Sequence, residues 1–388
     1  MRRCYFDHNA TTPVHPRVLE AMLPYYGPEY GNASSLHSFG QDARQGVESA
    51  RRQVAAQLGC DAKDVVFTSG GTEADNLAVF GTVRSAPGPS RHVVTTQIEH
   101  PAVLNACEQL EREGVDVTYL PVSGEGTVAP GDVRAAVRSD TVLITVMHAN
   151  NELGTMQPIK EIGSIAREAG VPFHTDGVQS FGKVATKVEE LGVDFFSLSA
   201  HKIYGPKGAG ALYVRRGLQL AKVQYGGSHE RDRRPGTENV PGIVGLGAAA
   251  ELAGSDSEQE NTRVGQLRDR FESELLSTIP DAHVHALDSP RLPTTSSVRF
   301  DHAESEPLLI SLDLQGFAVS SGSACSSGAV KPSHVLTAIG LSRDQAKSTL
   351  RFSLGRQTDE EQVDALLAAL PGMVERLRIL SPSWAGTA

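Results

Sequence analysis

The sequence predicts an α/β protein with a large domain built on a mainly parallel sheet and a smaller α+β domain. Short apolar stretches of strand type alternate with helical stretches over most of the chain, which is typical of a parallel sheet covered by helices on both faces. The composition then turns polar at Ser255–Glu258, which indicates a domain boundary. We therefore expect a large domain over residues 15–255 and a small domain formed by residues 1–14 and 256–388.

The individual elements follow from periodicity and from the residues that end them. Apolar residues recur at helical spacing from Val47 to Leu58, and Gly59 ends this helix. A second apolar stripe over Ile159–Ala166 is ended by Gly170. Strands of the large sheet are expected at Val65–Phe67, His92–Thr96, Val142–Met147, Pro172–Thr175, Val193–Leu198 and Gly210–Val214. The small domain is expected to contain a helix near Val264–Leu276, a strand at Ser297–Phe300 and a helix near Val363–Leu380.

Length and charge exclude several classes of function. A chain of 388 residues is long enough for two domains with separate cores. The net charge of −10 argues against a general nucleic-acid-binding protein and against adsorption to acidic membranes. No apolar run approaches the roughly 20 residues that a membrane-spanning helix needs. Residues Met1–Asp7 lack the apolar segment of a signal peptide, so we expect a cytoplasmic protein.

The four cysteines differ in their surroundings. They form no C-x-x-C pair, so we expect no metal site. Cys107 lies on an apolar helical stripe and is expected in the core, whereas Cys4 and Cys60 have no distinctive context. Cys325 lies in Ser320–Gly328, where the other residues are serine, alanine and glycine. This composition predicts a mobile loop, at about residues 320–332, rather than buried packing.

The most informative motif is Ser199–Gly205, which reads Ser-Ala-His-Lys-Ile-Tyr-Gly and follows an expected strand. A lysine at a strand end, here Lys202, can bind pyridoxal phosphate as a Schiff base, and Ser199 and His201 can bind the phosphate. Asp176 lies about one βα unit earlier and can keep the pyridine nitrogen protonated, which makes the ring an electron sink. The pattern predicts a pyridoxal-phosphate enzyme.

A second segment supports phosphate binding. Phe67–Leu77 runs from a strand through the turn Gly70-Gly71 into a helix, and backbone N–H groups at a helix N-terminus bind anions. On its own, this turn is more typical of a tight connection with Thr72 as the N-cap. Together with Ser199 and His201, it predicts a three-part phosphate site.

Three further polar segments follow or flank expected strands. His100 follows the strand His92–Thr96 and can stack on a cofactor ring or move protons, although a lone histidine before proline is more often a loop residue. Asn150–Gly154 opens the loop after the strand Val142–Met147, where open α/β sheets bind ligands. Arg351 lies between apolar neighbours, which suits either a structural ion pair or a carboxylate clamp.

Ordered motifs along nearly the whole chain are similar to those of one enzyme family. They are Asp7–Pro13, Gly31–Ser35, Phe67–Glu73, Glu99–Val103, Asn150–Glu152, Ser199–Pro206, Arg234–Asn239, Ser320–Gly328 and Arg351–Arg356. On these motifs the chain resembles cysteine desulfurases of the nitrogen-fixation and iron–sulfur-assembly type. These belong to the class V aminotransferase group of fold type I pyridoxal-phosphate enzymes, which implies a seven-stranded sheet in the large domain. Gly177 and Ala200 depart from the alanine and glycine usual in the family.

The resemblance implies a role for each candidate residue around the cofactor. Lys202 would form the Schiff base, Asp176 would pair with the ring nitrogen, and Gln179 would bind the ring hydroxyl. His100 would stack on the ring and take part in catalysis. The residues implied for the phosphate are Gly71, Thr72, Ser199 and His201, with Thr237 contributed by the neighbouring subunit of a homodimer.

The resemblance also implies the substrate and the reaction. L-cysteine would bind through Asn151 and Arg351, with Arg351 on its carboxylate. Cys325 would take the sulfur as a persulfide, leaving L-alanine, and would pass it to an acceptor protein for iron–sulfur cluster or other thio-cofactor assembly. The surroundings of Cys325 are similar to those in the long-loop type of the family.

Three alternatives remain open from the sequence. An ordinary class V aminotransferase would need Lys202 and Asp176 but would have no use for Cys325. A selenocysteine lyase shares the fold and acts on a closely similar substrate. A non-catalytic scaffold that retains the fold is the third, and the intact set of Lys202, Asp176 and Cys325 argues against it.

Overall fold

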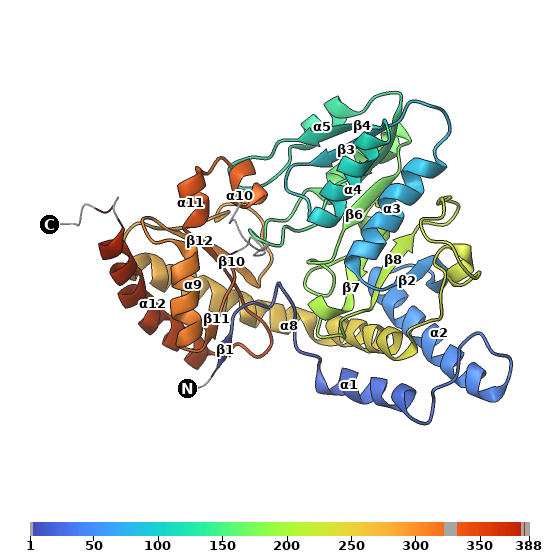
Figure 1. Cartoon of the computed structure of the whole chain (residues 1–388), viewed down its shortest axis with the longest axis horizontal. Coiled ribbons are helices and arrows are strands. Elements are labelled where there is room, and N and C mark those ends of the chain that lie inside the picture. The colour runs from blue at the N-terminus through green and yellow to red at the C-terminus, as the bar shows by residue number, and fades with distance from the viewer. Residues whose placement is uncertain (1–2, 322–331, 382–383, 385–388) are drawn as a thin grey trace.

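Two lobes connected by one long helix make up the structure (Figure 1). The computed structural model describes residues 3–321, 332–381 and 384. Helix α8 (Val240–Thr278) packs on α2 in the large lobe and on α12 in the small lobe. None of the helices within these ranges combines the length and the apolar character needed to cross a bilayer.

The large lobe contains a seven-stranded sheet in the order β2-β8-β7-β6-β5-β3-β4. Neighbouring strands are parallel except at β8, which runs antiparallel to both β7 and β2. The strands are β2 (Val65–Thr68), β3 (His92–Thr96), β4 (Asp116–Leu120), β5 (Thr141–Thr145), β6 (Phe173–Asp176), β7 (Phe195–Ser199) and β8 (Gly210–Val214). The predicted α/β fold with a mainly parallel, seven-stranded sheet is confirmed.

Helices cover both faces of this sheet because its strands are apolar on both sides. Val66 packs with α3, whereas its neighbour Phe67 packs with α2 and α8 in a separate cluster. Gly59 and Gly170 end α2 and α6 in the left-handed conformation, as the sequence predicts. The helices of this lobe are α1 (Pro16–Met22), α2 (Ser38–Leu58), α3 (Gly71–Ser85), α4 (Pro101–Arg112), α5 (Pro130–Ala136), α6 (Ile159–Ala169) and α7 (Val188–Leu191).

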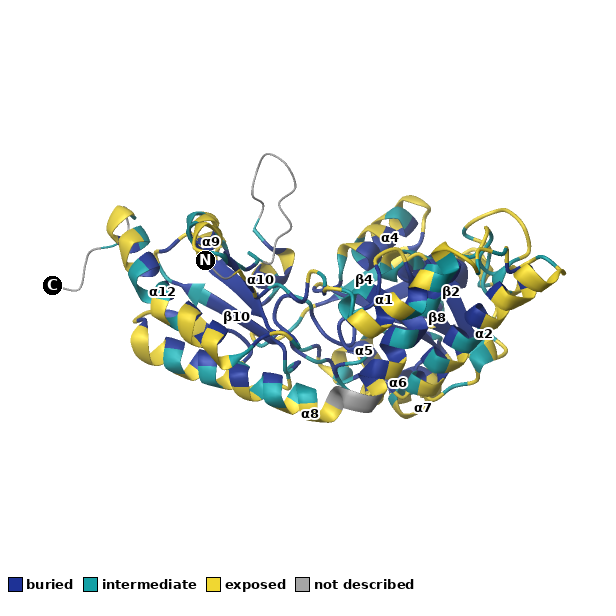
Figure 2. Cartoon of the chain, turned by 90° about the horizontal axis from the view of Figure 1, so that it is seen from below, coloured by how far each residue is buried: buried dark blue, intermediate teal, exposed yellow. Residues whose placement is uncertain are grey.

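The small lobe is built on an antiparallel sheet in the order β12-β10-β9. Its buried face packs on helices through an apolar cluster that includes Phe271, Phe300 and Phe352, and Figure 2 shows these strands buried beneath helices with exposed outer faces. The elements are β1 (Cys4–Tyr5), β9 (Ala282–Val284), β10 (Thr295–Phe300), α9 (Ser305–Leu314), β11 (Phe317–Ala318), α10 (His334–Ala338), α11 (Arg343–Lys347), β12 (Thr349–Ser353) and α12 (Glu360–Leu380).

Strand β4 and helix α8 are two of the elements that differ from those read in the sequence. Strand β4 was not expected, and it lies at the sheet edge, where Asp116 is exposed and the next residues are half-buried, so it lacks an apolar run. The helix expected near Val264–Leu276 is the second part of α8, which continues through the polar stretch Ser255–Glu258. The helix continues here without a break, and the flanking residues Gly254 and Glu258 are exposed. The residue ranges of the two domains stay a prediction.

The N-terminal segment is a second connection between the two lobes. Strand β1 pairs with β11, and Asp7 forms a β-bridge with Ser353 in the small lobe. The segment then reaches the large lobe, where the backbone N–H of Thr12 donates to the carbonyl oxygen of His201 at 2.9 Å. Residues 4–12, the N-terminal strap, therefore join the end of β12 to the turn after β7.

A close approach between β6 and β7 depends on Gly177. A Cβ atom at this position would lie 1.9 Å from Cζ of Phe196, whose ring is fully buried. The ring of Phe196 therefore fills the space in which the family's usual alanine would place its methyl group.

A buried ion pair holds the loop that precedes α8. Both carboxylate oxygens of Glu230 accept hydrogen bonds from Arg51 at 2.7 Å, and both side chains are 5% exposed. The backbone N–H of Phe67 donates to the same carboxylate at 2.8 Å, and the Arg51 guanidinium lies over the Phe67 ring. Glu230 thus ties the loop that contains Thr237 to α2 and β2.

We predict that Glu230→Gln destabilises the protein by about 3–5 kcal/mol, because it removes the buried counterion of Arg51 and leaves only Glu48, whose side chain is 42% exposed. Urea unfolding curves measure this free energy. Glu20→Gln, at an exposed position of α1, is the matched control and should change stability by less than about 0.5 kcal/mol. A change below about 1 kcal/mol for Glu230→Gln would contradict the anchoring role of this pair.

Candidate active site

A cavity of ≈ 440 Å³ lies at the carboxyl ends of the large sheet and extends to the small lobe. Parallel sheets bring the residues that follow successive strands to one edge, which is where such sheets bind ligands. The lining residues are Asn9, Ala10, Gly71, Thr72, Asp75, His100, Met147, Ala149, Asn151, Asp176, Val178, Gln179, Ser199, His201, Lys202, Ser320 and Arg351. The volume is in the range of pockets that bind cofactors and small substrates.

The structure brings most of the predicted site residues to this cavity. The predicted residues that line it are Gly71, Thr72, His100, Asn151, Asp176, Gln179, Ser199, His201, Lys202 and Arg351. Thr237 is exposed and is not among the lining residues. Cys325 lies outside the described residues, while Ser320 in the same predicted loop lines the cavity.

Lys202 ends a short 3-10 turn, Ala200–Lys202, directly after β7. Its Nζ atom donates to the backbone carbonyl oxygens of Asn9 at 2.6 Å and Ala10 at 2.8 Å. Burial, followed by the nearby charge of Arg351, lowers the pKa of Lys202 to about 8. The amine is therefore far closer to its neutral, nucleophilic form at physiological pH than an exposed lysine is.

Two buried carboxyl groups and an imidazole meet at the end of β6. Polar atoms of Asp75, His100 and Asp176 lie within 4.8 Å of one another. Burial raises the pKa of Asp176, and burial together with Asp176 raises the pKa of Asp75 well above its usual value. A cation in the cavity would stabilise the ionised form of Asp176, and a protonated pyridine nitrogen is such a cation.

His100 has a structural contact besides its place in the cavity. It is the N-cap of α4, where its Nδ1 atom accepts from the backbone N–H of Ala102 at 3.1 Å. Burial lowers the pKa of His100, which favours the neutral imidazole. Because His100 both caps α4 and lines the cavity, the two interpretations from the sequence, loop residue and ring-stacking residue, are compatible.

The start of α3 forms an anion-binding corner. The N-cap is Gly70, and no side chain caps the helix, so the alternative with Thr72 as N-cap is wrong. A Cβ atom at Gly71 would come within 2.6 Å of Val178, so glycine is required for this close packing. Uncapped N–H groups at a helix N-terminus beside Ser199 and His201 suit a phosphate group.

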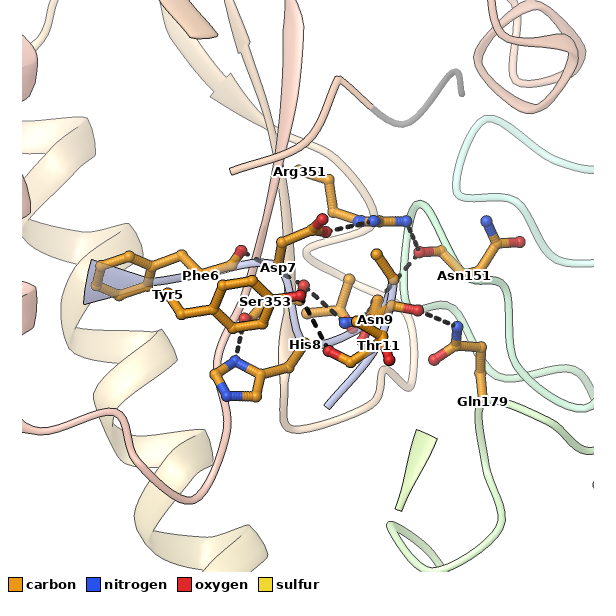
Figure 3. A network of polar contacts seen from close by, with 12 residues as sticks. Tyr5, Phe6, Asp7, His8, Asn9, Thr11, Asn151, Gln179, Arg351 and Ser353 are labelled. Atoms are coloured by element: carbon orange, nitrogen blue, oxygen red, sulfur yellow. Dashed lines mark hydrogen bonds and ion pairs between the residues drawn. The ribbon is translucent and has the colours of Figure 1, made fainter. Parts of the chain in front are cut away.

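Arg351 is held at the small-lobe side of the cavity (Figure 3). Its Nη1 atom donates to the carbonyl oxygen of Asn151 at 2.9 Å, and its Nη2 atom donates to Oδ1 of Asp7 at 2.7 Å. The Nε atom is buried and has no hydrogen-bond partner among the described residues. An unpaired, buried N–H donor is costly, and a carboxylate ligand would satisfy it.

Among the cavity residues that were not predicted as site residues, Asn9 and Asp75 have polar contacts that organise the cavity. The carbonyl oxygen of Asn9 accepts from both Lys202 and Gln179, and the Asn9 side chain donates to Oγ1 of Thr295 at 2.8 Å. Asn9 belongs to the motif Asp7–Pro13, but its role as a backbone acceptor does not depend on its side chain and so cannot be predicted from residue type. Asp75 follows Gly71 by one helical turn, and this spacing could have placed both on the cavity side of α3.

Comparison with known proteins agrees with this geometry. The profile described as Aminotransferase class-V matches residues 4–366. The chain belongs to the class V aminotransferase family. The resemblance drawn from the sequence motifs is confirmed, and the cofactor of the family is pyridoxal phosphate.

Similar proteins match this chain over nearly its full length. A cysteine desulfurase of Trichormus azollae is 49% identical over 97% of this chain and 94% of its own length. A solved NifS-like protein covers 97% of this chain and 100% of its own, with 37% identity and a TM-score of 0.90. The structure of SspA in complex with cysteine covers 92% of this chain and 100% of its own, with 39% identity and a TM-score of 0.82.

The residues present fit pyridoxal phosphate. The carboxyl group of Asp176 would suit the ring nitrogen, the N–H groups at the start of α3 would suit the phosphate, and the amine of Lys202 would suit the aldehyde. Each group comes from a different strand end, so the fold itself sets their separation.

The pKa of Lys202 predicts how cofactor uptake depends on pH. Only the neutral amine attacks the aldehyde, so the initial rate of uptake by the apoprotein should rise about tenfold per pH unit below pH 8 and level off above it. Stopped-flow absorbance after mixing with pyridoxal phosphate measures this rate, and Lys202→Ala controls for reaction at surface lysines. A rate that still climbs steeply between pH 9 and 10.5 would show that Lys202 keeps its ordinary pKa of 10.5.

Proposed function

We propose that this protein is a pyridoxal-phosphate-dependent cysteine desulfurase, which converts L-cysteine to L-alanine and stores the sulfur on Cys325. The observation that carries the proposal is the convergence of an amine, a carboxylate and a guanidinium group on one cavity, from Lys202, Asp176 and Arg351. The names of the relatives, which match nearly the full length of the chain, support the same activity.

The cavity residues divide between the parts of the cofactor. Asp176 pairs with the ring nitrogen, Gln179 binds the ring hydroxyl, and His100 covers the ring. The phosphate is bound by Gly71, Thr72, Ser199 and His201. When bound, pyridoxal phosphate supplies an electron sink for the negative charge that develops at the substrate Cα atom.

Lys202 and Arg351 act on the substrate. The Arg351 guanidinium binds the carboxylate of L-cysteine, next to Asn151, and so orients the Cα–H bond. The amine of Lys202 removes the Cα proton and returns a proton later in the reaction. A base with a pKa of about 8 is well matched to proton transfer near neutral pH.

Cys325 performs the sulfur transfer. As the thiolate, it attacks the substrate sulfur, so that an S–S bond forms while the bond between sulfur and the substrate Cβ atom breaks. The electron pair of the broken bond stays on carbon, which takes up a proton, and L-alanine leaves. The persulfide on Cys325 then passes its outer sulfur to an acceptor protein of iron–sulfur cluster or other thio-cofactor assembly, in the cytoplasm.

We also propose that the active enzyme is a homodimer in which Thr237 reaches the phosphate of the partner subunit. Thr237 is exposed in this chain and lies in the loop that Glu230 anchors, so its side chain is free to reach a second subunit. Large apolar side chains are also exposed on the large lobe, where a second copy would cover them: Leu19, Leu23, Tyr26, Tyr30, Leu36, Phe39 and Tyr225. No contribution of membrane or nucleic acid is part of this proposal.

Mass spectrometry after brief exposure to L-cysteine tests the proposed function. We expect the wild-type peptide that contains Cys325 to gain one sulfur atom while L-alanine appears. Cys325→Ser should keep the cofactor and bind cysteine but lose sulfur transfer, because a serine hydroxyl is a poor nucleophile at neutral pH. A persulfide on Cys4, Cys60 or Cys107 instead, or full alanine formation by the serine variant, would refute the role of Cys325.

Mixed dimers test the role of Thr237. Thr237→Ala should weaken cofactor binding about tenfold or more, because a hydrogen bond to a charged phosphate is lost. A dimer of one Thr237→Ala subunit and one Lys202→Ala subunit has one site with an intact lysine and an intact threonine from its partner. That site should bind the cofactor with wild-type affinity. Weak binding at every site of the mixed dimer would mean that Thr237 acts within its own subunit.

A further inference from the structure

Lys183 is a second buried lysine; it does not line the active-site cavity itself but contacts Gln179, which does, and the reaction described above does not use it. It lies in the turn that follows β6 and is 9% exposed. Its Nζ atom donates to Oε1 of Gln179 at 3.0 Å. The Nδ2 atom of Asn261, on α8, donates to the backbone oxygen of Lys183 at 2.6 Å and holds the turn in place.

The amide of Gln179 is fixed from two sides. Its Oε1 atom accepts from Lys183, and its Nε2 atom donates to the carbonyl oxygen of Asn9 at 2.9 Å (Figure 3). In the reversed orientation, the amide oxygen would face the Asn9 carbonyl and the NH₂ group would face the lysine ammonium, which has donors only. Both hydrogen bonds would be lost, so the two partners select one orientation.

The selected orientation determines what Gln179 offers to a ligand. A primary amide carries two N–H donors, and Asn9 accepts from Nε2. Gln179 lines the cavity, so its NH₂ group remains available as a donor there, while its oxygen is occupied by Lys183. An ionised ring oxygen needs a donor and would be repelled by an amide oxygen.

We infer that Lys183 is a positioning residue: its hydrogen bond to Gln179 makes that side chain a donor, rather than an acceptor, toward the ring oxygen of the cofactor. This inference rests on the proposed role of Gln179. It assigns Lys183 no contact with the cofactor or the substrate.

The surroundings of Lys183 are consistent with this role. Burial, followed by the charges of Lys202 and Arg351, lowers the pKa of Lys183 to about 7. Lys183 also lines a second, small cavity, and the other titratable groups there include His8 and Glu260. As the ammonium, Lys183 has donors only and needs Oε1 of Gln179 as its acceptor. As the neutral amine it still has N–H donors for Oε1, and the Asn9 carbonyl, which accepts from Nε2, continues to exclude the reversed amide.

Absorbance titration of the holoenzyme tests the inference. The pH of the visible transition reports the proton shared between the Lys202 nitrogen and the ring oxygen of the bound cofactor. A donor to the ring oxygen stabilises its negative charge and loosens its hold on that proton. Lys183→Met should therefore raise the midpoint by about one pH unit and weaken pyridoxal-phosphate binding about tenfold, which corresponds to one charge-assisted hydrogen bond.

A double-mutant cycle separates positioning from a general charge effect. Gln179→Leu should produce the same two changes, and adding Lys183→Met to it should produce almost none, because Lys183 acts through Gln179. Lys160→Met, at an exposed position of α6, is the matched control and should leave both values unchanged. If Lys183→Met does not fold, Lys183→Gln, which is too short to reach Gln179 as the amine does, carries the same expectation.

The outcomes distinguish the inference from the function on which it rests. Wild-type values for Lys183→Met, with clear shifts for Gln179→Leu, would overturn the inference and leave the proposed role of Gln179 intact. Additive shifts in the double variant would also overturn it, because Lys183 would then act through its charge alone. Wild-type values for Gln179→Leu would refute the role of Gln179 itself.

Discussion

The carbonyl oxygen of Asn9 is the contact on which the organisation of the cavity depends. It accepts hydrogen bonds from Lys202 and Gln179, whose strands β7 and β6 belong to the large lobe. The same residue donates to Thr295 in the small lobe, and the neighbouring Asp7 pairs with Arg351. The N-terminal strap therefore positions the amine of Lys202, the proposed base, relative to the guanidinium of Arg351, the proposed carboxylate-binding group. No other described segment contacts Lys202, Gln179 and Arg351 together.

The electrostatics of the cavity favour an anionic ligand at one end and a cationic ring atom at the other. Burial lowers the pKa values of Lys202 and Lys183, and the charge of Arg351 lowers both further. Burial raises the pKa values of Asp75 and Asp176, because it disfavours their ionised forms. A phosphate or carboxylate would pair with the buried cationic groups, and a protonated ring nitrogen would pair with the buried carboxyl groups. Ligand binding would therefore reduce the free-energy cost of burying these charged groups.

The sequence was sufficient for the sheet and for the residues at its strand ends, because apolar periodicity and glycine turns are local signals. It was insufficient where the signal is not local. Asn9 acts through its backbone, and β4 is a half-exposed edge strand without an apolar run. The pairing of Lys183 with Gln179 is visible only once the turn after β6 is known. Roles such as that of Gln179 came from family resemblance, since spacing alone does not specify which ring atom a side chain contacts.

The packing of Gly177 against Phe196 has a consequence for substitution at both positions. Alanine at position 177 would collide with the Phe196 ring, so the family's usual residue does not fit here while the ring keeps its position. A smaller residue at position 196 would make room for alanine at 177, but with Gly177 still present it would leave a void beside β6, the strand that contains Asp176. The side chain at position 196 therefore decides which residues position 177 can accept, and the residue at 177 decides how large a side chain fits at 196.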